Sequence, residues 1–409
     1  MKILIVNTFD ISGGAARAAY RLHQSLKSVG VDSYMLVQFK ISNDPHVIQI
    51  QNFLYKFRPI LDKLPLIFYK NKALFSTAWV PFSTIAEKIN SIDADVIHLH
   101  WVASGMIRIE DLKKINKPIV WSLHDMWTFT GGCHYNCKCE KYINQCGACP
   151  VLGSNKTNDL SYSVFSRKEK TYSNISSLTV VGLSRWLTDC AKNSFVLRNT
   201  RVVNIPNPID VHEFRPFDKG NARNLLNLPL DKKLVLFGGI GAINDPRKGL
   251  SEFIAAMKNI ESSYINLVIL GSEQPLKSVE FSFPTHYIGH LPNDYLLCML
   301  YAAVDTLVVP SLQENLSNSI MECLACGTPV VAFDIGGNND MIDHKKNGYL
   351  AKPYDAKNLA VGIDWVLNHQ NSQELSQNAR NKVIENFESK MVARRYIELY
   401  EEILSNDSK

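Results

Sequence analysis

The chain has 409 residues with a formal net charge of +5, and 46% of its residues are hydrophobic while 20% are charged. A chain of this length is too long for a single hydrophobic core of ordinary size, so two domains are predicted. The composition excludes a disordered protein. The charge is mild and forms no concentrated basic stripe, which argues against a nucleic-acid partner.

The chain begins with an apolar run, residues 2–7, that predicts a buried strand. Asn7 and Asp10 interrupt the apolar stretch early, so it does not read as a signal peptide. No run elsewhere reaches about 18 apolar residues, the length that crosses a bilayer. We therefore expect a cytoplasmic protein whose thiols are reduced.

A helix is predicted over residues 12–30, because apolar residues recur there at helical spacing and Gly30 suits the end of a helix. Gly13 and Gly14 lie where this helix starts. Glycines let a ligand approach the backbone, and free helix amides suit a phosphate. The alternative is a tight turn from strand to helix.

Strand candidates continue through the first half of the chain, at residues 33–39, 95–101, 118–125 and 178–184. Asp93 and Asp95 match a metal-binding D-x-D pattern, but they precede a strand, and we interpret them as a helix-to-strand turn. His98 lies inside an apolar run and is expected in the core, near His100. His124 ends its strand, where it could donate a hydrogen bond or position a hydroxyl.

Residues 53–82 differ in composition from the rest of the chain, because they are rich in aromatic and apolar residues and carry a net positive charge. They form either surface helices and loops that cover the core or a patch that rests on anionic lipid, which needs both apolar area and Lys or Arg.

Residues 121–150 hold five of the nine cysteines. Cys133, Cys139, Cys146 and Cys149 follow the pattern C-x5-C-x6-C-x2-C, which ends in a common zinc half-site. In a reducing compartment, four close thiols favour zinc over disulfides. Four thiolates would close the site to substrate, so we expect a structural zinc, with free thiols and disulfides as the alternatives.

The second half of the chain repeats the alternation of strands and helices. Strands are predicted at 233–239, 265–272, 285–290, 306–311 and 329–334, and helices at 249–260, 293–304, 318–327 and through most of 355–408. Two such runs indicate an α/β protein with two Rossmann-like doubly wound domains and a cleft between them. The boundary falls in a proline-rich linker at 204–216, giving domains 1–205 and 206–389.

Candidate donor-binding residues follow two strands of the second domain. Arg247 and Lys248 come shortly after the first strand and suit a diphosphate, although a solvated pair of cations is the alternative. Glu314 follows a later strand, and Glu322 lies eight residues on, in a helix, where it could accept hydrogen bonds from a ribose diol. The residues between them that offer amides to an anion are Asn315, Leu316 and Ser317.

This stretch, with "ACGTPVVAFDIGG" after it, resembles the second-domain signature of the retaining GT-B glycosyltransferases of family 4. "VIHLHW", "WSLHDMWTFTGGC", "IPNPID", "RKG" and "NGYLAKP" resemble the subgroup of colanic-acid and O-antigen sugar transferases. The resemblance covers nearly the whole chain. It implies a nucleotide-sugar donor held by the second domain, a saccharide or lipid-linked acceptor held by the first, and a last helix, about 390–409, that packs back on the first domain.

The resemblance also implies roles for particular residues. Glu314 would contact the hydroxyls of the donor sugar, Glu322 the ribose and Lys248 the diphosphate, over which Gly13 and Gly14 would close. The related transferases have an arginine at the position of Ala242, and Arg247 is the candidate to replace it.

Further implications concern the reaction and its setting. His124, in the "LHD" motif, would position the donor sugar or the acceptor. The four zinc-candidate cysteines are shared with the related proteins, and Cys137 is extra. No catalytic metal is expected, because fixed cations and helix amides can stabilise the leaving diphosphate while the acceptor attacks on the same face.

The expected function is hexosyl transfer in bacterial surface polysaccharide synthesis in the cytoplasm, with a peripheral position on the inner face of the cell membrane as the alternative to a freely dissolved enzyme. Two alternatives are a nucleotide-sugar epimerase of the same shape and a non-enzymatic zinc-ribbon binding protein.

Overall fold

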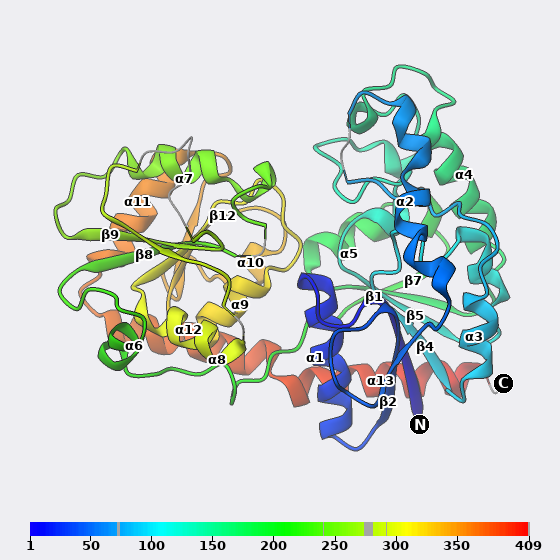
Figure 1. The fold of residues 1–409 in the computed structure, drawn as a ribbon, viewed down its shortest axis with the longest axis horizontal. Coiled ribbons are helices and arrows are strands. Elements are labelled where there is room, and N and C mark those ends of the chain that lie inside the picture. Colours follow the sequence, from blue (N-terminus) through cyan, green and yellow to red (C-terminus); the bar gives the residue numbers. More distant parts are fainter. Residues whose placement is uncertain (72–73, 240, 274–280, 292, 408–409) are drawn as a thin grey trace. The chain divides into compact units, whose positions relative to one another are not determined.

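The computed structural model describes residues 1–71, 74–239, 241–273, 281–291 and 293–407. The chain divides into two compact units, one formed by residues 1–208 with 390–409 and the other by residues 209–389 (Figure 1). The chain first passes from one unit to the other within the proline-rich segment 204–216, close to the domain boundary at 205/206 that the sequence predicts.

A seven-stranded parallel sheet forms the centre of the first unit, in the order β3-β2-β1-β4-β5-β6-β7. The strands are β1 (Lys2–Phe9), β2 (Asp32–Phe39), β3 (Val47–Gln49), β4 (Val96–Leu99), β5 (Ile119–Leu123), β6 (Leu178–Gly182) and β7 (Arg201–Asn204). The α-helices are α1 (Gly14–Ser28), α2 (Arg58–Asp62), α3 (Ile85–Ser91), α4 (Leu160–Tyr172), α5 (Arg185–Lys192) and α13 (Ser389–Asp407). The strand order reverses between β1 and β4, the place where doubly wound sheets bind ligands beyond the carboxyl ends of their strands.

Both faces of this sheet are buried, because successive side chains of a strand point to opposite faces. Ile3 and Ile5 pack in one apolar cluster with residues of α1 and α13. Leu4 and Val6 pack in a second cluster with the aromatic loop that follows β5. Burial on both sides explains why these strands read as continuous apolar runs rather than alternating ones.

The last helix, α13, packs on the first unit, as the family resemblance implied (Figure 1). The hydroxyl of Tyr400 lies 2.6 Å from Nδ1 of His98, and the hydroxyl of Tyr396 lies 2.9 Å from Oγ of Ser122. Ser122 Oγ also lies 2.8 Å from Nε2 of His98. His98 is therefore a buried core histidine with both ring nitrogens hydrogen-bonded, as predicted.

The second unit is built on a six-stranded parallel sheet in the order β10-β9-β8-β11-β12-β13. The strands are β8 (Lys233–Gly238), β9 (Ile265–Leu270), β10 (Thr285–Ile288), β11 (Thr306–Val309), β12 (Val330–Phe333) and β13 (Gly348–Ala351). The α-helices are α6 (Lys219–Leu225), α7 (Leu250–Met257), α8 (Asp294–Ala303), α9 (Asn318–Ala325), α10 (Asn338–Met341), α11 (Ala356–Leu367) and α12 (Ser372–Phe387). This order repeats that of the first unit, with the switch point between β8 and β11.

Three strands, β3, β7 and β13, escaped prediction from the sequence. All three are edge strands of three or four residues, too short for a long apolar run, and none of the four residues of β7 is fully buried. The pair Asp93 and Asp95 lies in the turn before β4, where each carboxylate bonds to Lys2 at the amino end of β1, which confirms the turn interpretation. Across the described residues, no helix combines the length and apolarity that crossing a membrane requires.

Candidate active site

Lys248 and Glu314 lie on the two sides of the switch point in the second unit. Lys248 ends a 3-10 turn, Pro246–Lys248, that follows β8, and Glu314 lies in the loop after the neighbouring strand β11. The Nζ atom of Lys248 is 2.6 Å from Oε2 of Glu314, whose side chain is mostly buried. The structure thus joins two predicted site residues in a charge-assisted hydrogen bond.

Backbone contacts hold these two loops together. The amide of Leu312 donates to the carbonyl oxygen of Arg247 over 2.7 Å. Gly249 has a φ of 77°, and a Cβ there would lie 1.9 Å from the carbonyl oxygen of Pro310. Gly336 has a φ of 53°, and a Cβ there would lie 1.8 Å from the carbonyl oxygen of Glu314. Both positions therefore require glycine. The close approach of Gly336 to the backbone of Glu314 is visible only in the tertiary structure.

Arg247 is held within its own loop. Its guanidinium pairs with the carboxylate of Asp245, whose other oxygen accepts the Arg247 amide over 3.0 Å. Ala242 is buried among apolar side chains of the second unit, so it belongs to the core there. The replacement of the family arginine by Arg247 stays a prediction.

Glu322 and the residues before α9 form the rest of the predicted donor site. The Glu322 carboxylate is buried and accepts a hydrogen bond of 3.1 Å from the hydroxyl of Tyr301 on α8. Ser317 precedes the first turn of α9, and its hydroxyl bonds to Ser319 over 2.9 Å instead of capping a helix amide. Asn315 and Leu316, like Ser317, are buried beside Glu314. Asn315, Leu316 and Ser317 therefore lie at the amino end of α9, where an anion is favoured, and Glu322 lies within the helix.

Gly13 and Gly14 lie in the first unit, where Gly13 precedes α1 and Gly14 is its first residue. Gly13 has a φ of 94°, and a Cβ built on it would meet nothing within 4 Å. The backbone at Gly13 therefore has open space beside it, and closure of the glycine pair over a donor stays a prediction.

His124 lies just after β5, beside His100, which follows the neighbouring strand β4. Nε2 of His124 is 2.8 Å from Nδ1 of His100. Burial lowers the pKa of His124 to about 4 and holds that of His100 well below its usual range. Both rings are therefore neutral near pH 7, and one donates a proton to the hydrogen bond that the other accepts.

A buried network that the sequence did not reveal supports this loop. The Asp125 carboxylate lies 2.6 Å from Nδ1 of His134 and accepts a hydrogen bond of 2.9 Å from Nε1 of Trp101. Oγ of Ser76 lies 3.0 Å from Nε2 of His134. The order Ser-His-Asp is that of a hydrolase triad, but Ser76 is 3% exposed and His134 is 0% exposed, so no substrate reaches them. The network instead holds the loop after β5 in shape.

The cysteine-rich loop contains four neighbouring thiols. Burial raises the pKa of the Cys133 thiol, and the adjacent thiols of Cys149 and Cys146 raise it further. Burial raises the pKa of Cys146 to about 12, with Cys139 and Cys149 as neighbours. Backbone amides donate to the sulfurs of Cys146 and Cys149, a type of contact that orients metal-binding thiolates.

These thiols offer the right chemistry for zinc, yet their arrangement does not form a ready metal site. Over the described residues, which include the whole loop, no three His, Cys, Asp or Glu side chains are grouped so that they could hold a metal ion. All four cysteines are free thiols here. Zinc binding stays a prediction, and a metal would have to draw the sulfurs together.

Two family models together cover most of the chain. Residues 12–213 match the Glycosyltransferase Family 4 model, and residues 218–385 match the model for Glycosyl transferases group 1. An uncharacterized glycosyltransferase of Methanocaldococcus jannaschii is 26% identical over 343 residues, 77% of this chain and 85% of that protein. The chain therefore carries both domains of a glycosyltransferase and is a hexosyltransferase.

Solved structures support the same architecture. The sucrose-phosphate synthase of Thermosynechococcus elongatus superimposes with a TM-score of 0.70 at 21% identity, over 99% of each chain. The Anabaena protein HepE, solved with UDP-glucose, gives a TM-score of 0.67 at 15% identity, over 98% of this chain and 100% of that one. The two parallel sheets of the present chain thus form a GT-B fold, as predicted.

Two relatives whose names specify a substrate match a smaller part of the chain. An N,N'-diacetylbacillosaminyl-diphospho-undecaprenol alpha-1,3-N-acetylgalactosaminyltransferase of Campylobacter jejuni is 29% identical over 44% of this chain and 48% of that protein. A UDP-Gal:alpha-D-GlcNAc-diphosphoundecaprenol alpha-1,3-galactosyltransferase of Escherichia coli is 25% identical over 45% of this chain and 49% of that protein.

Proposed function

We propose that this hexosyltransferase moves a sugar, with retention of configuration, from a nucleotide-diphosphate donor to a lipid-linked saccharide in bacterial surface polysaccharide synthesis. The ion pair of Lys248 and Glu314 at the switch point of the second unit carries the proposal. A cation paired with a carboxylate, where a doubly wound sheet binds its ligand, suits a diphosphate bonded to a polyhydroxyl sugar.

The second unit would hold the donor through three groups. Lys248 and the amides at the start of α9 would neutralise the charge that develops on the diphosphate as the anomeric C–O bond breaks. Glu314 would accept hydrogen bonds from sugar hydroxyls, and Glu322 would accept them from the ribose diol. Arg247 is a further candidate for the diphosphate.

The transfer would need no divalent cation. The acceptor hydroxyl attacks the anomeric carbon on the face that the diphosphate leaves, and its proton passes to a departing phosphate oxygen. The new bond to the acceptor oxygen therefore replaces the broken bond to the phosphate, with charge conserved. His124, held by His100, would orient the acceptor or the sugar on the first unit through a neutral ring nitrogen.

The proposal of a lipid-linked acceptor rests on two observations. Both relatives named above act on diphospho-undecaprenol saccharides, and each matches nearly half of this chain. The described part of residues 53–82, that is 53–71 and 74–82, presents an apolar and basic surface, with exposed side chains that include Phe68 at 89% and Phe82 at 92%. Such a surface fits an anionic membrane face, and we propose that the protein binds the inner face of the cell membrane peripherally.

A donor and acceptor panel tests the proposal. The protein is incubated with UDP-, GDP- and ADP-sugars, with and without a polyprenyl-diphosphate saccharide, and nucleotide release and glycolipid product are measured. The expected result is one preferred donor, acceptor-dependent release of its nucleoside diphosphate, and a product whose anomeric configuration equals that of the donor. Formation of an epimeric nucleotide sugar without transfer would support the epimerase alternative, which the comparisons do not favour.

A further inference from the structure

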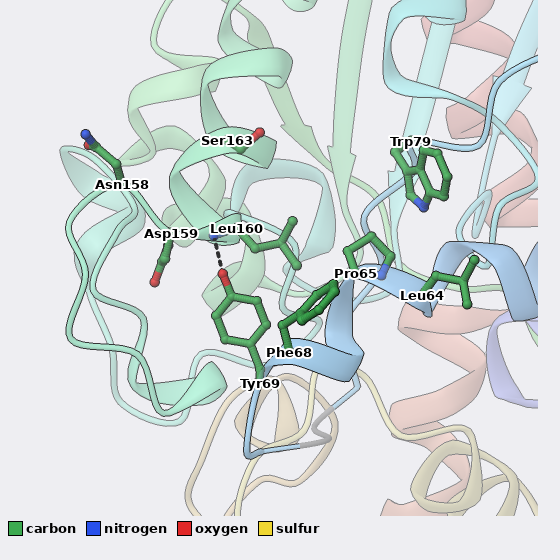
Figure 2. Close-up of a pocket in the computed structure, with 9 residues that line it drawn as sticks. All are labelled: Leu64, Pro65, Phe68, Tyr69, Trp79, Asn158, Asp159, Leu160 and Ser163. Carbon is green, nitrogen blue, oxygen red and sulfur yellow. Dashed lines mark hydrogen bonds between the residues drawn. The ribbon is translucent and has the colours of Figure 1, made fainter.

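A pocket of about 560 Å³ opens on the first unit beside the apolar and basic surface of residues 53–82. One wall comes from the 3-10 helix Leu64–Phe68 and Tyr69, and the opposite wall comes from the start of α4, with Trp79 beside them (Figure 2). The volume lies within the range of about 300–1,000 Å³ that holds small organic ligands.

Three polar groups of this lining, those of Tyr69, Asp159 and Trp79, are engaged within the protein. The hydroxyl of Tyr69 accepts the amide of Leu160 over 2.9 Å, as Figure 2 shows. The carboxylate of Asp159 accepts the amides of Cys149 and Ser161, over 2.8 and 2.9 Å. Nε1 of Trp79 donates to the carbonyl oxygen of Leu61 over 3.1 Å. The walls therefore present mostly ring faces and aliphatic carbon to an occupant.

The lining holds one acid, Asp159, which is buried and bonded to backbone amides. The chain on either side of the first wall carries exposed cations at Lys56, Lys63 and Lys70. The single acid among residues 53–82 is Asp62, which is buried and bonded to Thr77. An apolar pocket beside a segment with exposed cations complements a hydrocarbon chain that ends in a phosphate.

We infer that this pocket binds the first part of the prenyl chain of the lipid-linked acceptor, whose diphosphate the exposed lysines of residues 53–71 would attract. The inference rests on the lipid-linked acceptor of the proposed function. A peptide is a poorer occupant, because its backbone amides and carbonyls would lie unpaired against apolar walls. A prenyl chain carries no such groups.

A filled pocket tests the inference. Ser163 is exposed and lines the pocket on α4, so Ser163→Trp occupies the space without removing a core side chain. Ser173→Trp is the matched control, because Ser173 is an exposed serine at the far end of the same helix and lies outside the lining. Farnesyl phosphate, used below its micelle concentration, is the probe for calorimetric titration of the full chain.

Saturable binding of farnesyl phosphate should weaken about tenfold in Ser163→Trp and stay unchanged in Ser173→Trp. The KM for a polyprenyl-diphosphate saccharide should rise by a similar factor in Ser163→Trp, while the KM for the same saccharide diphosphate on a short alkyl chain stays constant. No saturable binding, or equal losses in both variants, would overturn the pocket assignment while leaving the transferase proposal in place. Binding that Ser163→Trp blocks, without transfer to any lipid-linked acceptor, would support the pocket and overturn the proposed acceptor.

Discussion

Nζ of Lys248 and Oε2 of Glu314 lie 2.6 Å apart although 66 residues separate them in the chain. Two adjacent parallel strands, β8 and β11, bring their loops to the same edge of the sheet. The pair forms because the carboxyl ends of neighbouring parallel strands meet there, and it places opposite charges where a charged sugar donor would bind.

Glu314 and Glu322 should differ in their kinetic effects. Glu314→Gln should lower kcat by about 10²-fold with a small change in donor KM, because it would contact the sugar as charge develops. Glu322→Ala should raise the donor KM about tenfold with kcat nearly constant, because the ribose does not react. Steady-state kinetics on the preferred donor measure both effects. Small and equal losses from the two variants would remove the assigned roles.

His124→Ala should lower the rate by about 10²-fold, a usual share for a positioning or proton-transfer group. Because the pKa of His124 is held to about 4 by burial, its ring is neutral from pH 5 upward. The pH profile of kcat/KM should therefore show no inflection from this histidine between pH 5 and 8, in contrast to an exposed imidazole. Activity of His124→Ala within a few-fold of the unmodified protein would assign His124 a structural role.

The stability of the first unit should fall in mild acid. Burial lowers the pKa of His98 to about 3 and that of His124 to about 4, whereas an unfolded histidine has a pKa near 6.5. Between pH 6.5 and 4 the unfolded chain binds protons that the folded chain does not. The stability that these histidines contribute is therefore complete above pH 6.5, and the free energy of unfolding decreases as the pH falls below it.

Urea unfolding from pH 7.5 to 4.5 measures this loss. His98→Asn should be less stable at pH 7.5 but less sensitive to acid, because one buried imidazole is gone. A pH-independent midpoint of unfolding in the unmodified protein would contradict the assignment of neutral buried histidines.

Binding to anionic vesicles should depend on salt. Co-sedimentation with anionic vesicles should be strong at low ionic strength and decrease as salt rises, because the distance over which charges attract one another falls to about 10 Å at 0.1 M salt. Phe82→Ser should weaken vesicle binding by removing exposed apolar area. Absence of binding at low salt would make a soluble saccharide the better acceptor.

Elemental analysis should find close to one zinc per chain in protein purified without chelator. The double variant Cys146→Ser/Cys149→Ser should lose the metal, because it removes the C-x2-C half-site. The matched single variant Cys137→Ser, at an exposed cysteine outside the predicted four, should keep it. Metal-free protein with full activity would leave these residues as free thiols of the core.

The sequence by itself determined the two-unit organisation and much of the candidate site. Apolar runs such as residues 2–7 and 233–239 are continuous because both faces of a parallel sheet are covered, so they stand out without structural knowledge. Lys248 and Glu314 were predicted because each follows such a run, and the carboxyl ends of parallel strands are where these folds bind ligands.

Only the tertiary structure decided which side chains meet across long separations. His134 pairs with Asp125, and Tyr400 reaches His98 over 302 residues, contacts that no local spacing encodes. The edge strand β7 and the glycine at position 336 likewise depend on their neighbours rather than on their own residues. Local periodicity reports the burial of a segment, whereas hydrogen bonds between distant segments form only once the sheet has set their loops side by side.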